Sequence, residues 1–97
     1  MMSQLEDPTH PGEMLKELYL DPLVMGAIAI ARRLGVPRTR IEQLIKGTTG
    51  MTPDTALHLA CAFNTTPAYW MNFQTNYDMV AASKEVDVSG IEPLTLI

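Results

Sequence analysis

The chain has 97 residues, 46% of them hydrophobic and 19% charged, a balance that suits one folded domain and argues against disorder. Its formal net charge of −4 argues against generic affinity for nucleic acid, because neutralised phosphates supply most nonspecific binding. No apolar run approaches the roughly 20 residues that cross a bilayer, and the acidic stretch MMSQLEDPTHPGE does not resemble a signal peptide. We therefore expect no membrane segment.

The first two predicted helices span about residues 11–20 and 26–34. Apolar residues recur along both at spacings of three and four, as on a helix face that packs against a core. The expected buried residues are Met14, Leu15 and Leu18, then Ala27, Ile30, Ala31 and Leu34. Asp21-Pro22 ends the first helix, and Gly35 suits the left-handed conformation that closes the second.

The next three predicted helices span about residues 38–46, 53–63 and 67–82. Pro37 leads into the third helix, while Thr52 and Thr66 precede a proline and can cap the last two. The expected buried residues are Ile41, Leu44 and Ile45, then Ala56, Leu59, Ala60 and Phe63, then an aromatic stripe with Trp70, Phe73, Tyr77 and Val80. We interpret at least Trp70 and Phe73 as core.

The last segment has a different pattern. Apolar residues alternate with polar ones at Val86, Val88, Leu94 and Leu96, as in a short strand. One strand alone is not stable, so it either pairs with its copy in a second subunit or stays loose. We expect a single domain over residues 1–97, with a helical core at 10–82 and a tail at 83–97 that is a candidate dimerisation element.

The stretch AIAIARRLGVPRTRIEQLIKG, residues 27–47, predicts two helices joined by a short turn that contains Gly35. In a helix-turn-helix the second helix enters the major groove of DNA and the first crosses the backbone. Five of the seven basic residues lie here, with Glu42 as the only acid, whereas other acids gather toward both ends. The same layout also occurs in helical proteins that bind no DNA.

Candidate base-reading residues lie on the third helix, whose buried Ile41 and Ile45 turn the opposite side outward. Arg38 has paired donors suited to guanine, a contact worth about 1–3 kcal/mol of discrimination when bidentate. Gln43 suits adenine, and Thr39 suits a thymine methyl or a phosphate.

Phosphate contacts position a protein on DNA without reading its sequence. The residues expected to make them are Arg40 and Lys46 on the third helix and Arg33, next to Arg32, at the end of the second.

No residue set points to catalysis or to a metal. His10 and Glu13 flank Pro11-Gly12 and are interpreted as the start of a helix, and His58 has no ligand partner nearby in the sequence. Without metal-ligand spacing, a nucleophile–base pair or a phosphate-binding loop, we expect neither an enzyme nor a cofactor. Cys61 has no second cysteine to pair with, which fits a cytoplasmic protein, and we expect it to be a small buried apolar residue.

Three stretches resemble the HigA/VapI family of bacterial antitoxins and together cover nearly the whole chain. They are HPGEMLKE at residues 10–17, ARRLGVPRTRIEQLIKG at 31–47 and GMTPDTALHLACAFNTTPAYWMNFQTNYD at 50–78. The most specific parts are a T-x-D/E-x-A-x-x-L-A run and a closing W-x-N-x-Q-x-x-Y-D. The closing motif is carried by Trp70, Asn72, Gln74, Tyr77 and Asp78.

The resemblance implies an all-α, λ-repressor-like helix-turn-helix domain of five helices. It also implies a dimer that neutralises a cognate HigB-like mRNA-interferase toxin and represses its own operon at an imperfect palindrome. The residues that would inherit DNA contact are Arg38, Thr39, Arg40 and Gln43. Many relatives start the second helix with a polar residue that can bond a phosphate, whereas Gly26 and Ala27 offer only backbone N–H groups.

Two alternatives stay open at this point. One is a stand-alone helix-turn-helix transcription regulator without a toxin. The other is a protein-binding module with weak or vestigial DNA binding, which the overall acidity and Ala27 favour.

Overall fold

A computed structural model describes residues 9–95 of the chain. Its elements are α1 (Pro11–Leu15), the π-helical turn η2 (Lys16–Leu20), α2 (Ala27–Leu34), α3 (Arg38–Lys46), α4 (Pro53–Phe63) and α5 (Pro67–Glu85). Residues 1–8, which belong to the stretch MMSQLEDPTHPGE that does not resemble a signal peptide, lie outside the described residues. Leu96, expected in the C-terminal strand, also lies outside them. The all-α helix-turn-helix fold expected from the sequence is confirmed.

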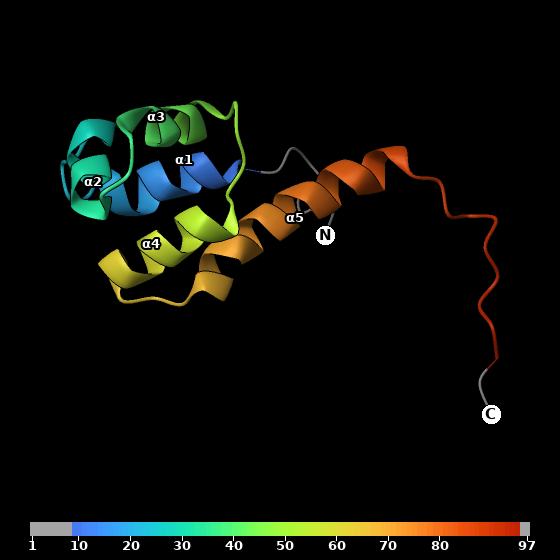
Figure 1. Cartoon of the computed structure of the whole chain (residues 1–97). Helices are drawn as coiled ribbons and strands as arrows, with labels where there is room; N and C mark the ends of the chain where they lie inside the picture. Colours follow the sequence, from blue (N-terminus) through green and yellow to red (C-terminus); the bar gives the residue numbers. More distant parts are fainter. Residues whose placement is uncertain (1–8, 96–97) are drawn as a thin grey trace.

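The helices form one packed end from which α5 projects (Figure 1). α1 packs on α3 and α5, α2 on α3 and α4, and α4 on the first part of α5. The buried apolar core consists of Leu15, Leu20, Ile30, Ala31, Leu34, Ile41, Leu44, Met51, Ala56, Leu59, Ala60 and Trp70. Trp70 is fully buried, its Nε1–H donates to the Thr65 hydroxyl at 2.7 Å, and four other aromatic rings surround it.

The predicted helix ends agree with the structure where the signal is local. Gly35 (φ 73°) and Gly47 (φ 82°) adopt the left-handed conformation that closes α2 and α3. The hydroxyl oxygens of Thr52 and Thr66 accept from backbone N–H groups in the first turns of α4 and α5. α2 begins one residue later than predicted, with Gly26 as its N-cap, and no side chain caps it.

The first predicted helix is not one continuous α-helix. Its second half, η2, has wider turns, and the Asp21 N–H donates to the Lys16 carbonyl at 2.8 Å, five residues back. The wider turn shifts which residues face inward. Leu18, expected in the buried stripe, is therefore 49% exposed, while Leu20 is buried.

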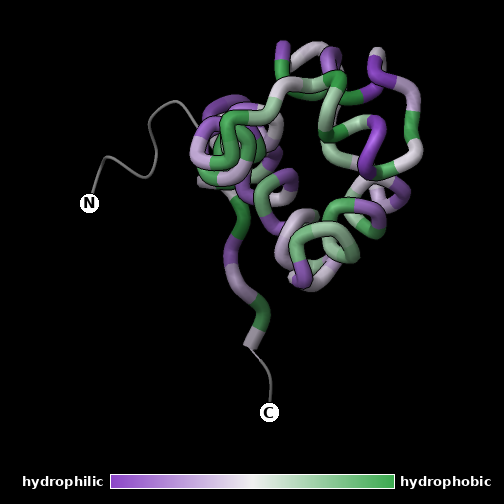
Figure 2. The backbone as a smooth tube through the Cα atoms, turned by 90° about the vertical axis from the view of Figure 1, so that its left-hand side faces the viewer, coloured by the Kyte–Doolittle hydropathy of each residue, from purple (hydrophilic) through white to green (hydrophobic). Residues whose placement is uncertain are grey.

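The C-terminal segment differs from the expected strand. α5 continues to Glu85, three residues beyond the predicted end, and residues 86–95 form no strand. Every residue from 81 to 95 is exposed. The part that follows α5 extends away from the packed helices and carries hydrophobic positions along its length (Figure 2). A lone segment has no strand to pair with in one copy of the chain, so its alternating pattern alone cannot make it extend as a strand.

Cys61 is also not where the sequence suggested. It lies on the outer side of α4 and is exposed, because the inner side of that helix is filled by Leu59 and Ala60. The prediction of a buried thiol was wrong.

Candidate nucleic-acid interface

The predicted DNA-reading residues lie on the outer side of α3. Ile41 and Leu44 on its inner side are buried, and Ile45 is half-buried. Arg38, Thr39, Gln43 and Lys46 are exposed, as is Arg33 at the end of α2, whereas Arg40 is half-buried. The structure thus brings the recognition-helix candidates to one surface, with Arg40 set back from it.

α3 is held on its inner side by a very close approach of α1. A Cβ built on Gly12 would lie 1.7 Å from the Leu44 carbonyl oxygen, so only glycine allows the two backbones to pack this closely. His10 caps α1 by accepting a hydrogen bond from the Gly12 N–H at its Nδ1, 3.0 Å away. The interpretation of His10 as part of a helix start therefore agrees with the structure.

Gln74 on α5 holds the loop that follows α3. Its Oε1 accepts from the Met51 N–H at 2.6 Å, and its Nε2 donates to Asp78 Oδ1 at 2.9 Å. Tyr77 on the same helix packs its ring edge-on against His10, with the centroids 5.0 Å apart. These roles were missed by the sequence reasoning, which identified the W-x-N-x-Q-x-x-Y-D motif without placing it.

Arg38 has only one weak intramolecular partner. Its Nε lies 3.9 Å from Glu42 Oε2, one helical turn away, and the two side chains are 62% and 38% exposed. An exposed pair at this distance holds little energy, so the guanidinium remains available for another acceptor.

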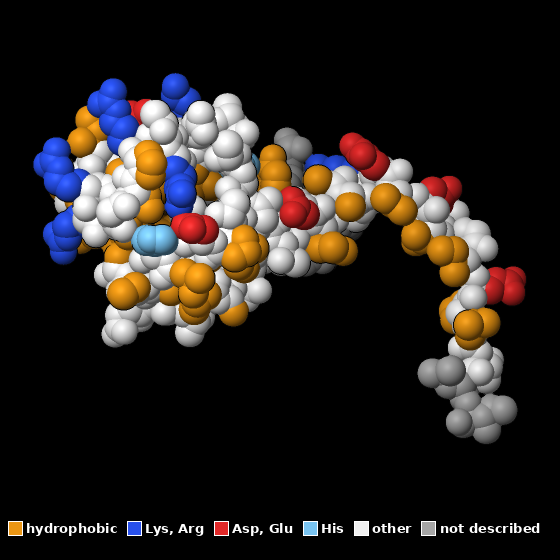
Figure 3. All heavy atoms as spheres, viewed as in Figure 1, with side chains coloured by type: hydrophobic (Ala, Val, Ile, Leu, Met, Phe, Trp, Pro, Cys, Tyr) orange, Lys and Arg blue, Asp and Glu red, His pale blue; other side chains and the backbone are white. Residues whose placement is uncertain are grey.

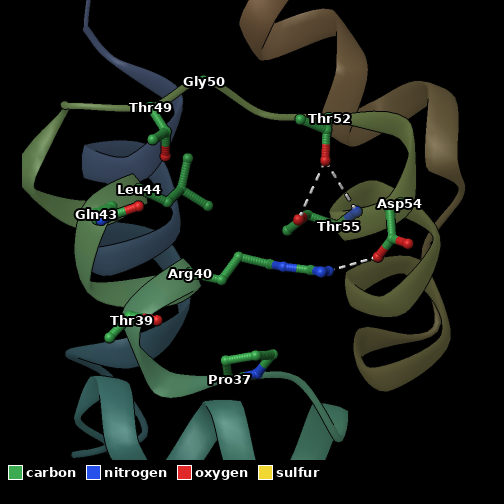
Figure 4. Close-up of a pocket in the computed structure, with 10 residues that line it drawn as sticks. All are labelled: Pro37, Thr39, Arg40, Gln43, Leu44, Thr49, Gly50, Thr52, Asp54 and Thr55. Carbon is green, nitrogen blue, oxygen red and sulfur yellow. Dashed lines mark hydrogen bonds and ion pairs between the residues drawn. The ribbon is translucent and has the colours of Figure 1, made fainter.

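Arg40 is engaged differently. Its Nη1 pairs with Asp54 Oδ1 on α4 at 2.5 Å (Figure 4). The Nδ1 of His58 lies 3.2 Å from the same carboxylate oxygen and 2.8 Å from the Asp54 carbonyl oxygen. The sequence did not predict this pair, because nothing local signals that α3 and α4 meet here.

The Arg40–Asp54 pair crosses a pocket of about 460 Å³ between α3 and the start of α4. Polar groups of Thr39, Gln43, Thr49 and Thr52 contribute to its wall. The space-filling view shows most of the Lys and Arg side chains of this face gathered over the packed end with α2 and α3, with a few acids among them, while further acids lie along α5 and the tail (Figure 3).

Two other kinds of site are not found in residues 9–95. Among these residues no group of three His, Cys, Asp or Glu side chains could hold a metal ion. Over the same range, none of the helices combines the length and the apolar character that crossing a membrane requires.

No protein-family model matches the chain. It is 41% identical to virulence-associated protein I of Dichelobacter nodosus over 76 residues, 78% of this chain and 70% of that protein. It is 38% identical to antitoxin HigA-1 of Vibrio cholerae over 72 residues, 74% of this chain and 68% of that protein.

Among solved structures, antitoxin HigA of Pseudomonas aeruginosa, crystallised with the higBA promoter, superposes with a TM-score of 0.81 at 32% identity. The match covers 91% of this chain and 99% of that one. The chain belongs to the HigA/VapI family of helix-turn-helix antitoxins. Membership places it among non-enzymatic antitoxins and transcription regulators, as the sequence predicted.

Proposed function

We propose that this HigA/VapI-family protein represses its own operon by inserting α3 into the major groove of operator DNA. The observation that carries the proposal is the two-sided character of α3, with Ile41 and Leu44 buried and Arg38 and Gln43 exposed. A short helix anchored in this way presents its polar side to a groove. The match to an antitoxin crystallised with promoter DNA supports the same role.

The side chains proposed to contact DNA are Arg38, Thr39, Arg40, Gln43, Lys46 and Arg33. Arg38 and Gln43 would read bases, since their donors suit guanine and adenine. Lys46 and Arg33 would contact phosphates from either end of the helix-turn-helix. At the start of α2 only backbone N–H groups are offered by Gly26 and Ala27, so we expect phosphate binding there to be weak.

Binding to the chain's own promoter tests this proposal. We expect fluorescence anisotropy with a labelled promoter duplex to show tight binding that weakens by about 5- to 150-fold for Arg38→Ala, the equivalent of about 1–3 kcal/mol. Lys84→Ala on α5 is the control for loss of one cation. Because Lys84 lies in the proposed dimer tail, light scattering first checks that this variant keeps the wild-type oligomeric state, and it should then bind as the wild type does. An Arg38→Ala protein that binds the promoter unchanged contradicts the placement of α3 in the groove.

A symmetric dimer fits the exposed apolar side chains of the projecting arm, which we define as the end of α5 and the tail. Met79, Val86, Val88, Ile91 and Leu94 are between 59% and 89% exposed there. We propose that the tail, residues 83–97, buries these groups against a second copy. The two α3 helices would then lie about 34 Å apart on an imperfect palindrome. Light scattering of a chain truncated after Ala82 is expected to show a monomer.

The antitoxin role extends this proposal to a protein partner. We propose that the chain neutralises a cognate HigB-like mRNA-interferase toxin in the cytoplasm and that acids on α1 and η2 help to capture it. The neighbouring Glu13 raises the pKa of the Glu17 carboxyl, and both residues are exposed, so two acids lie close together on this face. Such a face favours a basic partner. Glu13→Lys with Glu17→Lys should slow toxin association, and an unchanged rate contradicts this surface.

A protein-binding module with weak DNA binding is the second candidate, and one observation favours it. Arg40, a proposed phosphate contact, is already paired with Asp54. Co-purification of the neighbouring gene's product without any retention on promoter DNA would select this candidate over the repressor.

A further inference from the structure

The exposed carboxylate of Asp54, on α4, lies next to the half-buried Arg40 on α3. The two residues come from different helices, α3 and α4, and their ion pair crosses the pocket between them (Figure 4). The side chains of Arg40 and Asp54 are 39% and 62% exposed, so an approaching ligand can reach both. His58 contacts the carboxylate and the backbone carbonyl of Asp54, which fixes the acid in this position.

A guanidinium offers the same planar donors to a carboxylate and to a phosphodiester. In the unbound protein Asp54 occupies the Nη1 donor of Arg40. A DNA phosphate that approaches α3 must therefore compete with Asp54 for Nη1, or use the other N–H donors of a guanidinium whose charge Asp54 already partly neutralises. The Asp54 charge also repels the phosphate at short range, where salt screens it little.

We propose that Asp54 competes with DNA phosphate for Arg40 and so limits the affinity of the helix-turn-helix for the DNA backbone. This proposal rests on the DNA-binding role proposed above. The pair is partly exposed, so its strength is that of a surface ion pair and not of a buried one. The pair therefore lowers DNA affinity only a few-fold, which weakens binding without preventing it. Because phosphate contacts do not read bases, the ratio of operator to random-sequence affinity is unaffected.

Asp54→Asn tests the proposal in the full chain with two duplexes, the chain's own promoter and a random sequence. We expect both to bind about two- to five-fold tighter at about 0.1 M salt, which corresponds to the strength of one surface ion pair. The plot of log affinity against log salt should steepen by about one unit for each subunit bound, the signature of one added phosphate contact per subunit. Circular dichroism confirms that the variant is folded, and Asp54→Ser replaces it if it is not.

The deciding comparison repeats the substitution in an Arg40→Gln background, where no guanidinium is released. There we expect Asp54→Asn to change affinity no more than Glu42→Gln does. Glu42→Gln is the matched control, since it removes one acid from the same helix-turn-helix surface and leaves Arg40 unchanged. It also removes the weak contact to Arg38, an effect that is present in both backgrounds and cancels in the comparison. Its effect should be the same with and without Arg40.

Two results overturn the inference and leave the repressor role standing. The first is an equal gain from Asp54→Asn in both backgrounds, which assigns the effect to bulk charge alone. The second is weaker promoter binding by Asp54→Asn, which makes Asp54 a support that holds Arg40 for base contact. A wild-type protein that binds neither duplex at low salt instead removes the proposed function and this inference with it.

Discussion

Gly12→Ala should separate α1 from the recognition helix. The added Cβ would lie 1.7 Å from the Leu44 carbonyl oxygen and 2.4 Å from its carbon, whereas real Cβ contacts essentially never fall under 3.0 Å. The two backbones must therefore move apart by about 1.3 Å. Both groups are backbone, so no side-chain rotation can relieve the overlap.

Overpacking of a well-packed core costs about 1–3 kcal/mol, and we expect the upper end of that range here. For a domain of this size each kcal/mol lowers Tm by about 4–8 °C, so Gly12→Ala should melt about 12–24 °C lower. Thermal denaturation followed by circular dichroism measures this shift. Promoter affinity at low temperature should fall as well, because α3 moves with Leu44.

Gly90→Ala is the matched control, since an added Cβ at Gly90 meets nothing within 4 Å in one copy of the chain. Because Gly90 lies in the proposed dimer tail, light scattering checks that the variant keeps the wild-type oligomeric state. Its Tm should stay at the wild-type value. A Gly12→Ala protein that melts within about 3 °C of the Gly90→Ala protein would refute the reasoning, because α1 and α3 would then not be in backbone contact.

Two further predictions concern the groups that brace α3 and the core. Burial, and then the hydrogen bond with Tyr69, raise the pKa of Tyr19 to about 12. The neutral phenol is thus the form that the fold favours, and its contribution is complete below pH 10 and lost as the pH rises through 12. Urea unfolding should show this loss in the wild type, and Tyr19→Phe should flatten it between those pH values. Gln74→Ala leaves the Met51 N–H without its partner and should cost about 1–3 kcal/mol in urea unfolding, whereas Asn72→Ala, at an exposed position on the same helix, should cost less than about 0.5 kcal/mol.

Features set by local chemistry could be predicted from the sequence. α3 and α4 have the expected bounds because Gly47 closes one, and Thr52 with Pro53 opens the other. The side of α3 that faces outward could be predicted from the spacing of its isoleucines and leucine, because the apolar residues of an amphipathic helix set its buried side.

Features that depend on how the helices pack against one another could not be predicted from the sequence. The π-turn at η2 has no local sequence signal, and it moved Leu18 to the surface. Cys61 is exposed because of the side that α4 turns to its neighbours. The Arg40–Asp54 pair joins residues 14 positions apart on two helices, so only the packed structure brings it together.

The role of α3 as a recognition helix is tested most directly by scanning the promoter with 7-deazaguanine, which lacks the N7 acceptor, against wild type and Arg38→Ala. Replacing one particular guanine in each half-site should weaken binding of the wild-type protein about 5- to 150-fold. The same replacement should not weaken binding of the Arg38→Ala protein. The contrary result is a set of losses that is identical for both proteins at every guanine. In that case Arg38 reads no base, and α3 does not lie in the groove as described.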